Sequence, residues 1–78
     1  MNEKAKAQER IKVHVNGKAV WISRTFSVKH ALLAYNEDSL AEVVSGEAYV
    51  TDARGNEVGL DGSLFEGMRL YVRDVEIE

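Results

Sequence analysis

The sequence predicts an α+β domain in which one main helix packs on one face of a mixed sheet of four or five strands. Three observations lead to this prediction. Apolar and polar residues alternate around an Asn-Gly pair, an apolar stripe at helical spacing follows, and alternating segments return in the C-terminal half. The 78 residues are the length of one small domain. An OB-type barrel is the competing architecture, but it would need more strand before its helix.

The stretch RIKVHVNGKAVWIS, residues 10–23, predicts a β-hairpin. Asn16-Gly17 suits the type I′ turn of a two-residue hairpin, because both residues tolerate positive φ. Counting outward from this turn pairs Lys12 with Trp21, which share one face with His14. The opposite, apolar face contains Ile11, Val13, Val20 and Ile22. The count therefore predicts that the indole of Trp21 faces away from the core.

Two helices are predicted after the hairpin. SVKHALLAY, residues 27–35, has Ser27 as its predicted N-cap, and its His30 lies off the apolar stripe and is expected to be solvated. That stripe consists of Val28, Ala31, Leu32 and Tyr35. In SLAEVVSG, residues 39–46, Ser39 and Glu42 have capping-box spacing, and Gly46 can end the helix. The stripe of this shorter helix is expected to be Leu40, Val43 and Val44.

The C-terminal half predicts strands separated by turns. EAYVTD, residues 47–52, places Ala48 and Val50 on one face and Tyr49 and Thr51 on the other. ARGN is a turn, and EVGL is a short edge strand. DGSLFEG predicts a tight turn and a single helical turn, with Leu64 and Phe65 closing the end of the core. The last strand is MRLYVRDVEIE, residues 68–78. Met68, Leu70 and Val72 lie on one face of it, and Arg69, Tyr71 and Arg73 lie on the other.

Composition restricts the setting in which this domain works. The chain has no cysteine, so it cannot form disulfides or cysteine-ligated metal sites, and a reducing cytoplasm is favoured. Residues 1–10 lack the apolar region of a signal peptide and are expected to form a flexible charged tail before a domain at 11–78. No apolar run approaches the roughly 20 residues that span a bilayer. We therefore expect a soluble cytoplasmic protein that is monomeric alone.

Three segments together resemble the β-grasp (ubiquitin-like) fold, nearest to its ThiS/MoaD sulfur-carrier branch: IKVHVNGKAV, TFSVKHALLAY and LFEGMRLYVRD. The resemblance covers residues 11–75. It implies that the last strand lies beside the first and that the sheet face opposite the helix binds partners. Sulfur carriers and protein modifiers end in Gly-Gly, whereas this sequence ends Val75-Glu76-Ile77-Glu78. Plant-type ferredoxins share a similar hairpin but need cysteines for their cluster.

No catalytic, cofactor or metal signature stands out. His14 and His30 lack the spacing of a metal pair, the serines lack a G-x-S-x-G context, and the glycines miss the P-loop and Rossmann spacings. The net charge of −3 disfavours a nonspecific nucleic-acid binder. We therefore expect a protein that is not an enzyme and needs no cofactor.

The predicted function is a noncatalytic protein-interaction module, or a small accessory subunit, that binds a protein partner through the uncovered sheet face. The candidate partner-binding residues are Trp21, Tyr71, Arg69, Arg73, Lys12, His14 and Tyr49. Mixed aromatic and arginine side chains are enriched at interface hot spots. The structural alternative is that Trp21 and Tyr71 cover each other and the neighbouring stems. The functional alternatives are a divergent sulfur carrier or modifier, and single-stranded nucleic-acid binding with Trp21, Tyr49 and Tyr71 as stacking platforms.

Overall fold

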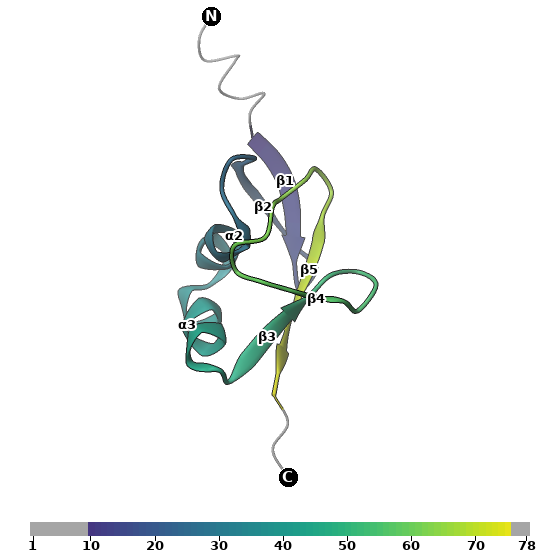
Figure 1. The fold of residues 1–78 in the computed structure, drawn as a ribbon. Coiled ribbons are helices and arrows are strands. Elements are labelled where there is room, and N and C mark those ends of the chain that lie inside the picture. Colours follow the sequence, from purple (N-terminus) through teal and green to yellow (C-terminus); the bar gives the residue numbers. More distant parts are fainter. Residues whose placement is uncertain (1–9, 76–78) are drawn as a thin grey trace, which may run out of the picture.

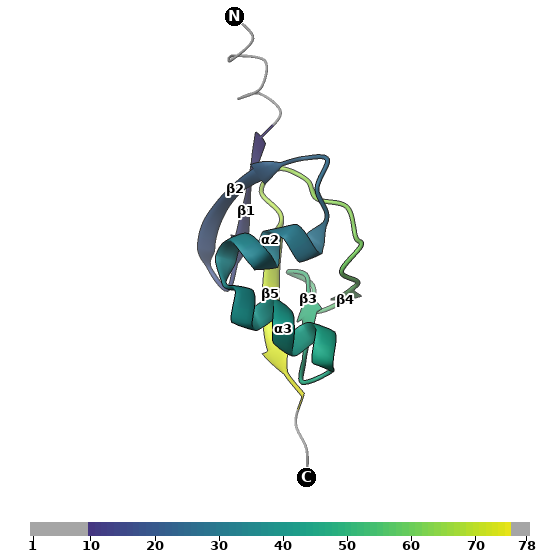
Figure 2. The ribbon, with the colours of Figure 1, turned by 90° about the vertical axis from the view of Figure 1, so that its left-hand side faces the viewer.

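The computed structural model describes residues 10–75, which form a mixed sheet with two helices on one side (Figure 1, Figure 2). In chain order the elements are β1 (Arg10–Val15), β2 (Lys18–Ser23), α2 (Val28–Tyr35), α3 (Glu37–Ser45), β3 (Ala48–Thr51), β4 (Glu57–Val58) and β5 (Arg69–Asp74). Most of the predicted tail, residues 1–9, lies outside the described residues, and β1 begins one residue before the predicted domain start.

The five strands have the order β2-β1-β5-β3-β4. The β1–β5 pair is parallel, and the other pairs are antiparallel. The last strand therefore lies beside the first, between the two hairpin-like pairs. This is a β-grasp-like topology, and the predicted α+β class with its mixed sheet is confirmed. No helix of residues 10–75 combines the length and the apolar character needed to cross a membrane.

The predicted hairpin register is confirmed. Val13 pairs with Val20, and Lys12 pairs with Trp21. The turn residues Asn16 and Gly17 have φ values of 53° and 85°, as a type I′ turn requires. Because side chains alternate between faces along a strand, this register places the apolar side chains of both strands on the helix side.

The core lies between the sheet and the helices. The buried apolar residues are Ile11, Val13, Val15, Val20, Ile22, Val28, Ala31, Leu32, Ala48, Val50, Leu64, Met68 and Leu70. The loop after β4 closes one end of this core and binds the start of α2. There the amides of Val28 and Lys29 donate to the carbonyls of Gly62 and Leu60 at 3.0 and 2.9 Å. These bonds satisfy amides that have no partner within the helix.

The second helix departs from its prediction at its start and in its stripe. Asn36, not Ser39, is the N-cap, and its side chain accepts a hydrogen bond from the Asp38 amide at 2.8 Å. Val44 is 69% exposed and does not join the half-buried Leu40 and Val43. The apolar stripe is narrow because α3 covers the sheet with one side only. The predicted C-terminal end at Gly46 is confirmed by its left-handed conformation, with φ of 90°.

The segment DGSLFEG was predicted to form a tight turn and a single helical turn. The tight turn is confirmed, because the Gly62 amide donates to the Gly59 carbonyl at 3.0 Å, and the helical turn is wrong. Residues 61–67 contain turns and no helix, and a hydrogen bond from the Met68 amide to the Phe65 carbonyl at 3.0 Å closes the last turn. Leu64 is buried, as predicted, whereas Phe65 is 61% exposed. Only one of these two neighbouring apolar side chains therefore closes the end of the core.

Asn16 does more than form the turn. Its amide donates to the Leu70 carbonyl at 2.9 Å, and its Oδ1 accepts from the Val72 amide at 2.9 Å. Its Nδ2 donates to the Tyr35 hydroxyl at 3.2 Å. One turn residue therefore links the hairpin to β5 and to the end of α2.

Replacing Asn16 with glycine should lower the free energy of unfolding by about 1–3 kcal/mol, because two side-chain hydrogen bonds are lost while positive φ stays accessible. The Asn16→Asp variant keeps the acceptor for Val72, and its second carboxylate oxygen can accept from the Tyr35 hydroxyl, so its stability should be closer to that of the parent than to that of Asn16→Gly. Urea unfolding of the three proteins measures both effects. An Asn16→Gly variant as stable as the parent would show that these side-chain bonds do not stabilise the fold.

Candidate interaction surface

The sheet face opposite α2 and α3 is not covered by any described element (Figure 1). All seven predicted partner-binding residues alternate with buried core residues and so lie on this face. We call them the open face: Lys12 and His14 of β1, Trp21 of β2, Tyr49 of β3, and Arg69, Tyr71 and Arg73 of β5. Trp21, Arg69 and Arg73 are exposed, and the other four are half-buried.

One end of the open face is formed by Trp21 and Lys12. The indole is 62% exposed, which confirms the predicted outward direction. The Lys12 Nζ lies 5.3 Å from the centre of the indole ring, within the range of a cation–π interaction. The Lys12 amide donates to Glu66 Oε1 at 3.1 Å, so one carboxylate lies beside this end.

The middle of the open face is the seam between β1 and β5. There His14 stands directly beside Arg69. The His14 Nδ1 atom is buried and has no hydrogen-bond partner within residues 10–75. Arg69 is exposed, so the seam presents a guanidinium to solvent.

The other end of the open face joins β5 to β3. Tyr71 is opposite Thr51, and Arg73 is opposite Tyr49. The Arg73 guanidinium lies 5.5 Å from the centre of the Tyr71 ring, and its Nε donates to Thr51 Oγ1 at 3.3 Å. Thr51 is buried, although it lies on the same face of β3 as Tyr49.

The two aromatic ends are well separated. Trp21 is level with Lys12, and the parallel register places Tyr71 four residues further along the strands. Four strand residues span about 13 Å. Trp21 and Tyr71 therefore do not cover each other, and this part of the structural alternative is wrong. The other part holds, because each ring is covered by a cationic side chain.

His30 has a role that the sequence interpretation missed. It was expected to be solvated, but its Nδ1 accepts a hydrogen bond from the Ser27 amide at 3.0 Å, in the N3 position of a capping box. Its ring also lies 4.6 Å from that of Phe26. The signal was the three-residue spacing from Ser27, which is usually completed by glutamate or glutamine.

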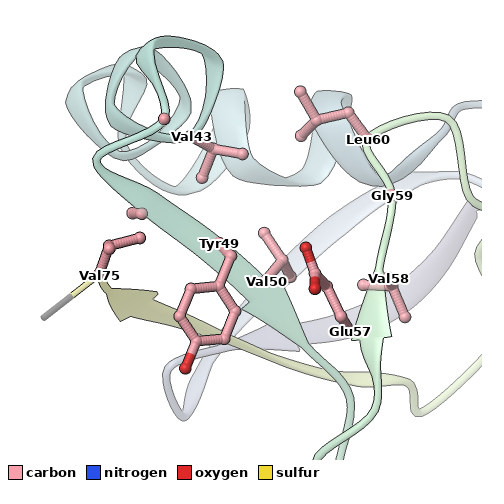
Figure 3. Close-up of a pocket in the computed structure, with 10 residues that line it drawn as sticks. Val43, Tyr49, Val50, Glu57, Val58, Gly59, Leu60 and Val75 are labelled. Carbon is pink, nitrogen blue, oxygen red and sulfur yellow. The ribbon is translucent and has the colours of Figure 1, made fainter.

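Two grooves lie at opposite edges of the sheet, and each combines segments that are far apart in the sequence. The groove between α3, β3 and β4 has a volume of about 490 Å³. In Figure 3 Val43 of α3 and Leu60 of the loop after β4 lie on either side of it, with Glu57 nearby. The other groove, which we call the β2 groove, has a volume of about 410 Å³. It is lined by Arg10, Trp21, Ile22, Ser23, Phe26, His30, Leu33 and Ala34.

Among residues 10–75, the titratable group with a clearly displaced pKa belongs to a turn. The pKa of Asp52 is lowered, first because its carboxylate accepts the Asn56 amide, with the Arg54 amide and the Arg54 charge adding to the effect. The amide distances are 3.0 and 2.9 Å. These bonds shape the loop between β3 and β4. Within residues 10–75, no three metal-ligating side chains converge.

Comparison with known proteins finds no matching family model, no matching curated protein and no matching solved structure. The β-grasp-like description therefore rests on the sheet order and on the parallel β1–β5 pair.

Proposed function

We propose that this domain is a noncatalytic β-grasp interaction module, or a small accessory subunit, that binds a protein partner through the open face. The observation that carries the proposal is the 62% exposed Trp21 in the middle of a regular strand, on a sheet face that the helices leave uncovered. Trp, Tyr and Arg dominate the residues that contribute most to protein–protein affinity. All three types occur on the open face.

The positive charge of the open face indicates the kind of partner that it binds. Lys12, Arg69 and Arg73 place cations along its whole length, and two of them lie over aromatic rings. A surface with carboxylates around a central apolar contact would pair with this arrangement, because interfaces bring complementary potentials together. The partner we propose is therefore a protein with an acidic binding surface.

Within β-grasp proteins we place the domain nearest to the ThiS/MoaD branch. The hairpin around Asn16-Gly17, the α2 segment and the entry into β5 support this placement. Binding is proposed and sulfur transfer is not, because the support lies in the exposed side chains of the open face. Intact-mass spectrometry of the protein from its native cells should show no adenylated or thiocarboxylated C-terminus. Either modification would favour the carrier function instead.

The decisive experiment compares partner recovery from native extract by three immobilised proteins. The Trp21→Ala/Tyr71→Ala variant should lose the partner that the parent retains, because both aromatic contacts of the open face are removed. Its free energy of unfolding should fall by no more than about 1–2 kcal/mol, since Trp21 is exposed, Tyr71 is half-buried and neither side chain belongs to the core. The Val44→Ala variant, altered at a 69% exposed residue on the helix side, should bind like the parent.

Two results of that comparison would contradict the proposal. Undiminished partner recovery by the double variant would remove the open face as the binding surface. The proteins could instead retain RNA and no protein partner, with the amount of bound RNA falling steeply as the salt concentration rises. That result would support single-stranded nucleic-acid binding on the same aromatic rings.

A further inference from the structure

The groove between α3, β3 and β4, which we call the α3 groove, lies at the end of the sheet where β5 finishes (Figure 3). Val75, which follows β5, is 42% exposed, and most of the other apolar lining residues are half-buried. The α3 groove is therefore an apolar surface that the described chain leaves partly open. Its larger apolar and aromatic lining residues are Val43, Tyr49, Val50, Val58, Leu60 and Val75.

The backbone of β3 has a free edge in the α3 groove. β4 pairs with Val50 and Thr51 only, so no described strand lies beside Ala48 on that side. The Val75 amide donates to the Glu47 carbonyl at 3.0 Å, toward β5. Because successive residues of an antiparallel strand direct their backbone groups to opposite sides, the amide and carbonyl of Ala48 face the groove. Within residues 10–75, no hydrogen bond joins either group to the chain on that side of β3.

These two backbone groups indicate that the groove receives a polar partner group as well as an apolar one. Ala48 is only 4% exposed, so its amide and carbonyl lie deep in the groove. Buried backbone groups of proteins are nearly always paired, because an unpaired one loses its hydrogen bonds to water without replacement. A bound segment that donates and accepts at Ala48 would satisfy both groups.

The surroundings of the α3 groove are acidic. Residues 36–51, which include α3 and β3, contain no lysine or arginine. Glu57 of β4 is exposed and lines the groove itself (Figure 3). This charge is opposite to that of the open face, so the groove favours a cationic occupant. The acidic residues of 36–51 are Glu37, Asp38, Glu42 and Glu47, and all four are exposed.

Charge excludes two occupants that this chain could supply itself. Residues 76–78, Glu-Ile-Glu, directly follow Val75, and laying them over the groove would add two carboxylates to an acidic surface. Two copies of the chain joined through their α3 grooves would also bring acidic surfaces together. Like charges at an interface oppose association.

Residues 1–9 do not suit the α3 groove either. Apart from Met1 they contain no large apolar side chain. They precede Arg10, which the β1–β5 register places ten strand residues, about 33 Å, from Val75. The remaining occupant is a segment of another protein.

We propose that the α3 groove binds a segment of a partner protein in which large apolar side chains are flanked by lysine or arginine. The apolar side chains pack against Val43, Leu60 and Val75, the cations pair with Glu57 and the acidic residues of α3, and the segment exchanges hydrogen bonds with Ala48.

This inference goes beyond the proposed function, because it adds a second binding surface of opposite charge. The open face attracts an acidic protein, and the α3 groove attracts a basic segment. Tyr49 belongs to both surfaces, so they adjoin. One small domain can therefore hold two partners of opposite charge side by side.

The test uses the full-length protein, uniformly labelled with ¹⁵N, and a pooled synthetic library of peptides of about eight residues with Leu, Ile, Phe or Trp flanked by Lys or Arg. For the tightest member, the amide signals of Gly46, Ala48 and Gly59 should shift, and that of Trp21 should not. The exchange rate of the Ala48 amide should fall about tenfold or more at saturation, because this amide becomes hydrogen-bonded. A matched peptide with glutamate in place of the basic residues should bind about tenfold more weakly or worse.

Three variants at exposed positions identify the contacts, and all three should fold. Glu57→Lys should weaken the peptide about tenfold or more, because it places a cation inside the groove. Glu66→Lys makes the same charge change beside β1 and should weaken it less than about threefold. Val75→Asn removes an apolar contact without changing the charge and should weaken it about fivefold.

A further variant separates this inference from the proposed function. Trp21→Ala should change the peptide affinity less than about twofold, because Trp21 lies on β2 at the other edge of the sheet. Loss of all peptide binding, with normal recovery of the open-face partner, would overturn the α3 groove and leave the open face intact. The opposite pair of results would overturn the open face alone.

Other outcomes also overturn the inference. They are a library with no binding member, equal weakening by Glu57→Lys and Glu66→Lys, and signal shifts confined to β1 and β2. Binding that requires removal of residues 76–78 would identify the chain's own C-terminal residues as the occupant. A dimer in sedimentation experiments that Glu57→Lys dissociates would identify a second copy.

Discussion

Replacing Leu32 with alanine should lower the free energy of unfolding by about 2–5 kcal/mol, the cost of leaving a cavity at a fully buried leucine. Leu32 is 0% exposed and belongs to the core that joins α2 to the sheet. The total free energy of unfolding of a domain of this length is about 4–12 kcal/mol. The variant should therefore lose a large fraction of its stability. Chemical denaturation with urea measures the loss directly.

The neighbouring leucine provides the control. Leu33 is 51% exposed, so the free energy of unfolding of the Leu33→Ala variant should lie within about 0.5 kcal/mol of the parent value. The two substitutions remove the same atoms from consecutive positions of α2. Equal losses of stability would contradict the packing of this helix, because they would mean that both side chains contribute alike to the core.

Reversing the charge of Arg69 should give the largest change in binding. Arg69→Glu puts a carboxylate beside His14 in the middle of the open face, where the partner is proposed to be acidic. Like charges brought together at an interface cost several kcal/mol, so partner affinity should fall about 100-fold or more. The free energy of unfolding should change little, since the side chain is exposed. Surface plasmon resonance with the recovered partner measures the affinity.

The control for charge is Lys29→Glu, which changes the net charge equally on the exposed side of α2. It should leave the affinity within a few-fold of the parent, because it lies on the opposite layer. An equal loss in both variants would mean that the overall charge attracts the partner, and the open face would lose its special role.

The hairpin and the direction of Trp21 could be predicted because they depend on local rules. Strand side chains alternate with a period of two, and Asn16-Gly17 determines where the count begins. The same alternation predicted the outward residues of β3 and β5. The capping residue of α2 was also within reach of sequence, since Ser27 directly precedes an apolar stripe.

Other features needed the tertiary structure. Asn36 and Ser39 are both good N-caps, and only the position at which α2 ends selects Asn36. Phe65 looks like a core residue by composition, but the chain at 61–67 turns without forming a helix, so Leu64 alone is buried. Local sequence contains no signal for such a choice between two apolar neighbours.

The arrangement of the candidate site was the least predictable part. Each residue of the open face could be assigned from its own strand, but their spacing depends on the β1–β5 register, which pairs His14 with Arg69. That register separates Trp21 from Tyr71. The β2 groove was missed because it joins Arg10, the end of β2 and one side of α2, which meet only when the helix crosses the sheet.

The central claim, an uncovered sheet face with Trp21 in contact with solvent, is tested most directly by the fluorescence of this single tryptophan. Acrylamide should quench the native protein nearly as well as the urea-unfolded protein, with emission at a similar wavelength, because the side chain is 62% exposed. Strong protection from acrylamide together with blue-shifted emission would place the indole in an apolar environment. That result would contradict the alternation of side chains in the hairpin, which directs Trp21 away from the core. It would therefore also contradict the proposed binding surface.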